Sequence, residues 1–344
     1  MRIGVWGSYK FGNYGDDLMA LMVCDEIKAH GREPLVYSMH HRIAESAGVR
    51  ATSSAEEFFQ SVDAIIVGGG ALTANYGRES DLDAYHYNEI KKFNDLNVFY
   101  GRPTFVMSIG GNGDPDEPVP PEVVKLLGHH AVRGVTVRLR AEQQRLARHG
   151  LNVRYYPDVV LRAGKWAGAP DRRGDERVVG INLPMAKGIG LVVAGLGAAC
   201  RARGYRMRAV VTHHSACAEI AKGYGKKAEM VLDDVLFYRE AKEFTRELAK
   251  LAIVISYKLH VGVACMSTGG SFLSFGGKGK TGAFMSEHGA AGRAISKWKV
   301  YRLWESALLG FNKHVFKPNE LARSDIADAQ GHLEELRSFL RRLK

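Results

Sequence analysis

Closely spaced cysteines are absent from this chain of 344 residues. Its four cysteines lie far apart, at Cys24, Cys200, Cys217 and Cys265. This spacing excludes a small zinc module and a disulfide framework. No apolar run approaches the ~20 residues that span a bilayer, and no secretory signal precedes the first apolar segment. We therefore expect a cytoplasmic protein, and leave open a peripheral position at the inner membrane face.

An excess of acidic residues is also missing. Lys and Arg number 48 against 37 Asp and Glu, which gives a formal net charge of +11. Such a balance favours anionic partners, namely nucleic acid, acidic lipid or small molecules that carry phosphate or carboxylate. Nucleic acid is the least favoured, because no zinc-finger, RNA-recognition or helix-turn-helix signature is present. Solubility alone explains a modest excess equally well.

Short apolar segments alternate with helix-like stretches along the whole chain. The first half contains expected strands at Arg2–Trp6 and at residues 35–38, 64–67, 104–109 and 135–137, with a helix at 17–30. The second half contains expected strands at residues 178–182, 207–211, 252–255 and 272–275, with a long helix at 235–250. Alternation of this kind predicts an α/β fold of two doubly wound, Rossmann-like domains.

A change of composition separates the two expected domains. Residues 162–177 are rich in Gly, Ala and charge and lack apolar periodicity. We therefore predict an N-terminal domain at 1–165, a linker at 166–177, a C-terminal domain at 178–300 and C-terminal helices at 301–344. Two such domains that face each other hold ligands in a cleft at the carboxyl ends of their strands. The basic last helix, at 326–344, is more simply a solvated end than a contact with an acidic membrane surface.

Two glycine motifs follow strands of the first domain. Residues 12–16 (GNYGD) precede a helix, so Asn13, Gly15 and Asp16 could hold an anion or a sugar hydroxyl, although plain helix capping explains them too. The spacing differs from that of a dinucleotide-binding fingerprint. The strand at 64–67 leads into three glycines, and we expect the backbone of Gly69 and Gly70 to face a ligand.

Charged residues follow two later strands of this domain. Arg138 ends the strand at 135–137, where a guanidinium can grip a carboxylate or phosphate with two parallel hydrogen bonds. An interdomain or surface ion pair is an equally good interpretation. Asp158 is a candidate partner for such an arginine, or a contact for a substrate hydroxyl.

The most informative segment lies in the second domain. The strand at 252–255 gives way to Ser256, Lys258 and His260, followed by small residues that favour a helix. A cation and an imidazole at one helix start suit an anionic substrate and proton transfer near neutral pH, although a lone histidine there is more often structural.

Two other segments resemble known motifs only in part. Residues 274–281 (SFGGKGKT) lack the first glycine of a P-loop. Residues 213–217 (HHSAC) fit a polar loop better than a metal site.

Taken together, these motifs resemble the polysaccharide pyruvyl transferase family, whose architecture is similar to that of GT-B glycosyltransferases. The resemblance covers roughly residues 2–290, in consistent order. It includes G-N-x-G-D at 12–16, G-G-G at 68–70, Arg138, Asp158 and an S-x-R-L-H segment at 256–260. An aromatic residue and a lysine complete it at Phe275 and Lys280. Lys258 replaces the usual arginine of this segment, and extra glycine stands before Lys280.

The resemblance implies a cytoplasmic transferase of cell-envelope polysaccharide biosynthesis. It would move the pyruvyl group of phosphoenolpyruvate onto two hydroxyls of a hexose, with no cofactor and no metal. It assigns catalysis to His260, Arg138 and Lys258. It assigns substrate binding to Asn13, Gly15, Asp16, Gly69, Gly70, Asp158, Ser256 and Lys280. The acceptor would be a nucleotide- or lipid-linked saccharide. The alternatives are a glycosyltransferase that uses a nucleotide-sugar and a non-catalytic glycan- or phosphate-binding protein.

Overall fold

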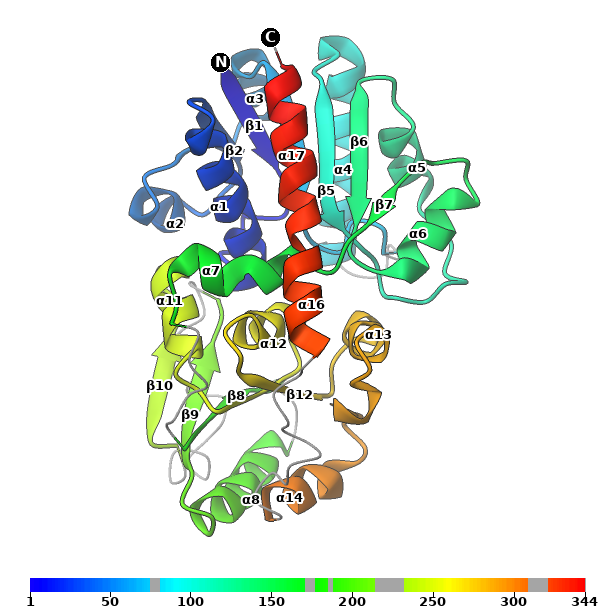
Figure 1. Cartoon of the computed structure of the whole chain (residues 1–344). Coiled ribbons are helices and arrows are strands. Elements are labelled where there is room, and N and C mark those ends of the chain that lie inside the picture. Colours follow the sequence, from blue (N-terminus) through cyan, green and yellow to red (C-terminus); the bar gives the residue numbers. More distant parts are fainter. Residues whose placement is uncertain (75–80, 171–176, 185–187, 214–231, 309–320, 344) are drawn as a thin grey trace. The chain divides into compact units, whose positions relative to one another are not determined.

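The computed structural model describes residues 1–74, 81–170, 177–184, 188–213, 232–308 and 321–343 (Figure 1). The chain forms two compact units. The first unit comprises Met1–Gly12, Asp16–Val159 and Asp328–Lys344. The second unit comprises Asn13–Gly15 and Val160–Ala327. The short segment Asn13–Gly15 therefore belongs to the second unit, although the rest of that unit begins about 145 residues later in the sequence.

The first unit is built on a seven-stranded parallel sheet in the order β3-β2-β1-β4-β5-β6-β7. Its strands are β1 (Arg2–Trp6), β2 (Glu33–Tyr37), β3 (Arg50–Thr52), β4 (Ala64–Gly68), β5 (Thr104–Ile109), β6 (Val132–Val137) and β7 (Arg154–Tyr155). The central strands β4 and β5 are buried along their whole length, which explains their unbroken apolar sequences. The sheet order reverses at β1 and β4, as a doubly wound fold requires.

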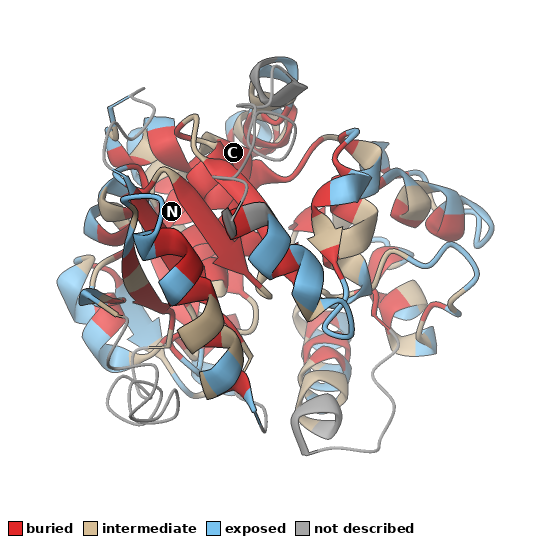
Figure 2. Ribbon diagram, turned by 90° about the horizontal axis from the view of Figure 1, so that it is seen from below, coloured by how far each residue is buried: buried red, intermediate tan, exposed pale blue. Residues whose placement is uncertain are grey.

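Helices cover this sheet. They are α1 (Tyr14–Ala29), α2 (His41–Ser46), α3 (Ala55–Ser61), α4 (Asp81–Tyr100), α5 (Pro121–Leu127), α6 (Arg140–Ala147) and α17 (Gln330–Arg342). Aromatic rings fill one side of the sheet, where Trp6 stacks on Tyr37 with ring centroids 3.8 Å apart and meets the edges of Phe58 and Phe93. Figure 2 shows the strands as buried and the outer faces of the helices as exposed.

The second unit has a six-stranded parallel sheet in the order β10-β9-β8-β11-β12-β13. Its strands are β8 (Val178–Asn182), β9 (Arg206–Val211), β10 (Asp234–Phe237), β11 (Ile253–Ser256), β12 (Ser271–Phe275) and β13 (Ala294–Ile295). Its helices are α7 (Ala163–Ala167), α8 (Ile189–Arg201), α11 (Ala241–Leu248), α12 (Leu259–Met266), α13 (Gly279–Glu287), α14 (Val300–Leu308) and α16 (Leu321–Asp328). The described residues also form the short 3-10 helices η1 (Val159–Arg162) and η2 (Ala291–Arg293). Two doubly wound parallel sheets confirm the predicted fold class.

The prediction of a helix at 235–250 was wrong for its first six residues, 235–240. Residues Asp234–Phe237 form β10, which pairs with β9, and the helix begins only at Ala241. Glu240 caps that helix, because its carboxylate accepts hydrogen bonds from the backbone N–H groups of Lys242 and Glu243. A short apolar run before a helix is compatible with a strand or with a first helical turn. Here the run forms a strand because it pairs with β9.

The domain boundaries also differ from the expected ones. The chain passes into the second unit at Val160 and returns to the first at Asp328. Residues 171–176, within the expected linker, lie outside the described residues. Helix α17 buries the apolar side chains of Leu333, Leu336, Phe339 and Leu340, and Figure 1 shows it across one face of the first sheet. It is therefore a structural part of the first unit rather than a solvated end.

Within the described residues, no helix combines the length and the apolar character needed to cross a membrane.

Candidate functional site

Polar side chains follow three neighbouring strands of the second sheet at their carboxyl ends. Asn182 ends β8, Ser256 ends β11 in register with it, and Thr212 follows β9 directly. The Ser256 hydroxyl accepts a hydrogen bond from the Lys258 N–H at 2.9 Å and lies 3.1 Å from Asn182 Oδ1. Because this edge of an open α/β sheet is where ligands bind, it is the candidate functional site.

Lys258 stands at the centre of this group, as the residue that precedes α12. Its ammonium group contacts three acceptors, Asn13 Oδ1 at 3.1 Å, Thr212 Oγ1 at 2.7 Å and His213 Nε2 at 2.7 Å. A charged ammonium can only donate, so His213 Nε2 must be unprotonated in this arrangement. The structure thus joins two predicted residues, Asn13 and Lys258, which are 245 positions apart.

His260 occupies the first turn of α12 and is only 7% exposed. Gly15 lies against its ring: a Cβ atom at Gly15 would be 2.3 Å from His260 Nδ1. Any side chain there would displace the imidazole. The sequence predicted both residues and assigned Gly15 to ligand contact; the structure adds that the glycine makes room for the histidine.

Tyr14 anchors the segment Asn13–Gly15 and was missed by the sequence reasoning. Its N–H donates to the Thr212 carbonyl at 2.9 Å, and its hydroxyl lies 2.7 Å from Thr245 Oγ1. The ring is fully buried, with the Phe244 ring centroid 4.6 Å away. Burial raises the pKa of the Tyr14 hydroxyl. An aromatic residue between two glycines of the GNYGD motif was the available signal.

Lys280 lies in the first turn of α13 and is half-buried. The loop before it uses Gly276 at φ +64° and Gly277, where a Cβ atom would be 2.5 Å from Ser274 Oγ. This strand, glycine loop and helix match the pattern that the sequence indicated. The role of Lys280 in substrate binding stays a prediction, as do the roles of Asn13, Gly15, Ser256, Lys258 and His260.

The other predicted residues belong to the first unit. Gly69 and Gly70 follow β4 at φ +75° and +88°, where glycine is strongly favoured. The Gly69 N–H donates to the Met107 carbonyl at 2.9 Å, so this amide is engaged within the unit. A Cβ atom at Gly70 would lie 3.6 Å from Asp16 Oδ1. The structure therefore brings Asp16 and the glycine turn together.

Arg138 and Asp158 form an ion pair, with Arg138 Nη1 3.1 Å from Asp158 Oδ2 and both side chains fully buried. Asp158 is thus the partner of Arg138, as one of its two interpretations had it, but the pair is buried within the first unit and is neither interdomain nor at the surface. Gly110 makes space for the guanidinium, since a Cβ atom there would be 2.9 Å from Arg138 Nε. This geometry supports a structural role for Arg138 and gives no support to direct contact with substrate.

His332 of α17 lies close to this ion pair and was not singled out from the sequence. Its Nδ1 is 2.8 Å from Thr136 Oγ1. Burial lowers the pKa of His332 to about 4, and the charge of Asp158 opposes that shift only in part. The imidazole is therefore neutral near pH 7.

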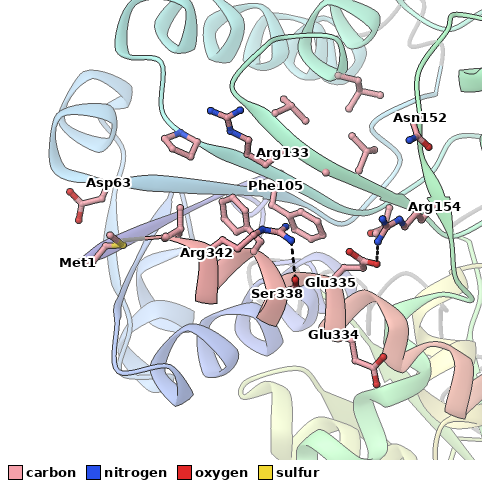
Figure 3. A pocket seen from close by; sticks show the side chains of 18 residues that line it. Met1, Asp63, Phe105, Arg133, Asn152, Arg154, Glu334, Glu335, Ser338 and Arg342 are labelled. Carbon is pink, nitrogen blue, oxygen red and sulfur yellow. Dashed lines mark hydrogen bonds and ion pairs between the residues drawn. The ribbon is translucent and has the colours of Figure 1, made fainter.

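A hollow with a volume of about 1100 Å³ lies elsewhere in the first unit (Figure 3). Met1, Asp63 and Pro103 line it, and these residues precede β1, β4 and β5. It therefore opens at the amino ends of the strands, opposite to the edge where such sheets bind ligands. None of the predicted site residues lines it.

In the described part of the chain, no three His, Cys, Asp or Glu side chains are grouped so that they could hold a metal ion. Four of the five residues of the HHSAC segment, 214–217, lie outside that part.

Comparison with known proteins gives a family and a fold. A model of the family described as polysaccharide pyruvyl transferase matches residues 13–279. No curated protein matches the chain. Similar solved structures include a UDP-GlcNAc 2-epimerase from Neisseria meningitidis bound to UDP-GlcNAc, with 13% identity, a TM-score of 0.61 and coverage of 99% of this chain and 100% of that chain. MnaA of S. aureus with UDP has 10% identity, a TM-score of 0.62 and coverage of 97% and 94%.

A third similar structure is HepE of Anabaena in complex with UDP and glucose, with 11% identity, a TM-score of 0.57 and coverage of 98% of this chain and 97% of that chain. Identities this low establish the fold alone. They confirm the predicted GT-B-like architecture.

Proposed function

The chain belongs to the polysaccharide pyruvyl transferase family, and we propose that it transfers the pyruvyl group of phosphoenolpyruvate to two hydroxyls of a hexose in a saccharide acceptor. The observation that carries this proposal is the grouping of Asn13, Gly15, Ser256, Lys258 and His260 in one unit, at the carboxyl edge of its sheet. These residues come from the two family motifs, GNYGD and SYKLH.

Lys258 and the start of α12 supply the positive charge that an anionic substrate needs. Phosphoenolpyruvate carries about three negative charges near neutral pH, and fixed cations and helix N-termini stabilise such charge. We assign the carboxylate or phosphate to Lys258, and the other anionic group to Lys280. Since all three protons of the Lys258 ammonium already meet acceptors, an incoming anion would replace one of them.

Arg138 is not part of this assignment, because its guanidinium is buried against Asp158. We infer that the pair instead supports the chain around β6 and the residues after β7.

His260 is proposed as the acid/base group. In the overall reaction, the methylene carbon of phosphoenolpyruvate gains a proton, two hydroxyl oxygens bond to the adjacent carbon, and the bond from that carbon to the phosphate oxygen breaks. Of the two hydroxyl protons, one ends on the new methyl group and the other on the released phosphate. A single imidazole held in place can carry both transfers in turn. The saccharide acceptor is assigned to Asp16, Gly69 and Gly70 of the first unit.

A glycosyltransferase that uses a nucleotide-sugar is the second candidate. The similar structures named above were determined with UDP or a UDP-sugar, which favours a nucleotide-linked donor or acceptor. A third candidate is a relative that binds glycans or phosphate without turnover.

One experiment separates the three candidates. The purified protein is incubated with phosphoenolpyruvate or with UDP-glucose, each with a panel of hexose-containing acceptors, and the products are analysed by mass spectrometry. Release of inorganic phosphate with a pyruvyl ketal on the acceptor supports our proposal. Release of UDP supports the glycosyltransferase, and ligand binding without turnover supports the third candidate.

A further inference from the structure

Large apolar side chains are exposed on α8, on α14 and in the turn before α14 in the second unit. Trp298 is 83% exposed, Leu191 60%, Tyr301 59% and Trp304 37%. We call these four residues the aromatic surface. Figure 1 shows α8 and α14 side by side. Single exposed apolar residues are ordinary, but a group with two tryptophans and a tyrosine indicates an interaction surface.

Helix α14 is anchored to the rest of the second unit by Leu303, Ala307 and Trp304. Leu303 and Ala307 are fully buried in the core of the second unit. Trp304 Nε1 donates to the Val192 carbonyl at 3.3 Å, and a Cβ atom at Gly195 would lie 2.9 Å from the Trp304 ring. With α14 fixed by these contacts, Tyr301 and Arg302 remain exposed on it.

Cations alternate with the exposed rings. Residues 297–305 (KWKVYRLWE) contain Lys297, Lys299 and Arg302, all exposed, and a single carboxylate at Glu305. Lys297 Nζ lies 5.1 Å from the centroid of the Trp298 ring. This short segment thus exposes amphipathic aromatic rings together with three cations.

We propose that the aromatic surface docks on the anionic surface of a phospholipid bilayer. Tryptophan and tyrosine favour the interface between headgroups and acyl chains, because one part of each ring system is apolar and another donates a hydrogen bond. The three cations would lie among the lipid phosphates, where each strengthens binding roughly fivefold. Charge complementarity selects an anionic bilayer over a neutral one. The proposal concerns binding only and does not rest on pyruvyl transfer.

The surface differs from the basic C-terminal helix, for which the sequence left membrane contact open without favouring it. The apolar side chains of α17 are buried within the first unit, so that helix has none to insert. Along residues 297–302, in contrast, Trp298, Tyr301 and the three cations are all exposed.

The test uses the full chain and sedimentation with vesicles of phosphatidylcholine alone or mixed with phosphatidylglycerol. We expect binding only to the mixed vesicles, weakened by salt, with a blue shift of tryptophan fluorescence. The double variant W298S/Y301S and the triple variant K297Q/K299Q/R302Q should each lose at least tenfold in binding.

Matched variants of the first unit control for net charge and for exposed rings. K91Q/K125Q/R148Q removes three exposed cations, and F99S removes a ring that is 81% exposed. Both should bind like the wild type. Equal loss by the two triple variants, or no sedimentation with phosphatidylglycerol vesicles, would overturn the proposal. If W298S/Y301S instead dissociates an oligomer in analytical ultracentrifugation, the surface joins copies of the chain and the proposal is wrong.

Discussion

His260 is nearly buried at the start of α12, with its ring against the backbone of Gly15. An acid/base group benefits from such confinement, because a ring that cannot swing away keeps its nitrogens directed at one substrate. Removing the imidazole tests its role in the reaction. We expect His260→Ala to lower kcat at least ~100-fold, and phosphate release from phosphoenolpyruvate measures this. Turnover within a few-fold of the wild type would remove His260 from the mechanism.

Gly15 gives a second test at the residue scale. In Gly15→Ala, the added methyl group would stand 2.3 Å from His260 Nδ1, so the ring must move. We expect a loss of kcat comparable to that of His260→Ala. Gly282→Ala is the matched control, because it also lies in a helix and a Cβ atom there meets nothing within 4 Å. If both variants retain activity, the close approach of Gly15 is unimportant for catalysis.

Lys258 allows charge to be tested apart from shape. Lys258→Met keeps much of the side-chain volume but removes three charge-assisted contacts, so it should lower kcat/KM by roughly thirtyfold, equivalent to about 2 kcal/mol. Lys258→Arg keeps the charge and should retain most activity. A collapse in Lys258→Arg with full activity in Lys258→Met would show that the site needs no cation at this position.

At the scale of elements, α17 completes the first unit from the far end of the chain. It carries His332 to the buried pair of Arg138 and Asp158. It also stacks Phe339 on Phe105 of β5, with ring centroids 5.6 Å apart. The packing of α17 on the first unit is therefore coupled to the protonation of the buried His332 imidazole.

That coupling predicts a pH dependence of stability. The pKa of His332 is about 4 in the folded protein against a usual value near 6.5. Between those values the unfolded chain binds a proton that the folded protein does not, so the free energy of unfolding should decrease as the pH falls from about 6.5 to about 4, by up to roughly 3 kcal/mol. Urea unfolding across this range measures it. His332→Gln should flatten the profile, whereas His149→Gln, at an exposed histidine, should leave it unchanged. A parallel profile in His332→Gln would assign the dependence to other groups.

At the scale of the whole molecule, each unit has its own sheet and its own core. Leu303 belongs to the core of the second unit, and Phe339 packs within the first. Leu303→Ala and Phe339→Ala should each destabilise by about 2–5 kcal/mol. Hydrogen exchange should show faster exchange chiefly in the unit that carries the substitution. Equal acceleration in both units, for both variants, would mean that the chain opens as one cooperative body.

The sequence alone predicted the local structure well. The expected strands at Arg2–Trp6, Thr104–Ile109 and Val178–Asn182 coincide with β1, β5 and β8. Apolar runs bounded by turn residues are local features, and a doubly wound fold follows from their alternation. The motif at 256–260 was also recognisable, because its serine, lysine and histidine follow an apolar strand directly.

Only the tertiary structure decided which distant residues meet. It placed Asn13–Gly15 with the second unit, packed Gly15 against His260, buried Arg138 on Asp158 and returned α17 to the first sheet. The spacing of apolar residues indicates which side of a helix or strand is buried, and it does so from a few neighbouring residues. These contacts, in contrast, join residues that are between 20 and about 250 positions apart. Which of these residues meet depends on the order of the strands and on close packing, and neither can be inferred from a single segment of the sequence.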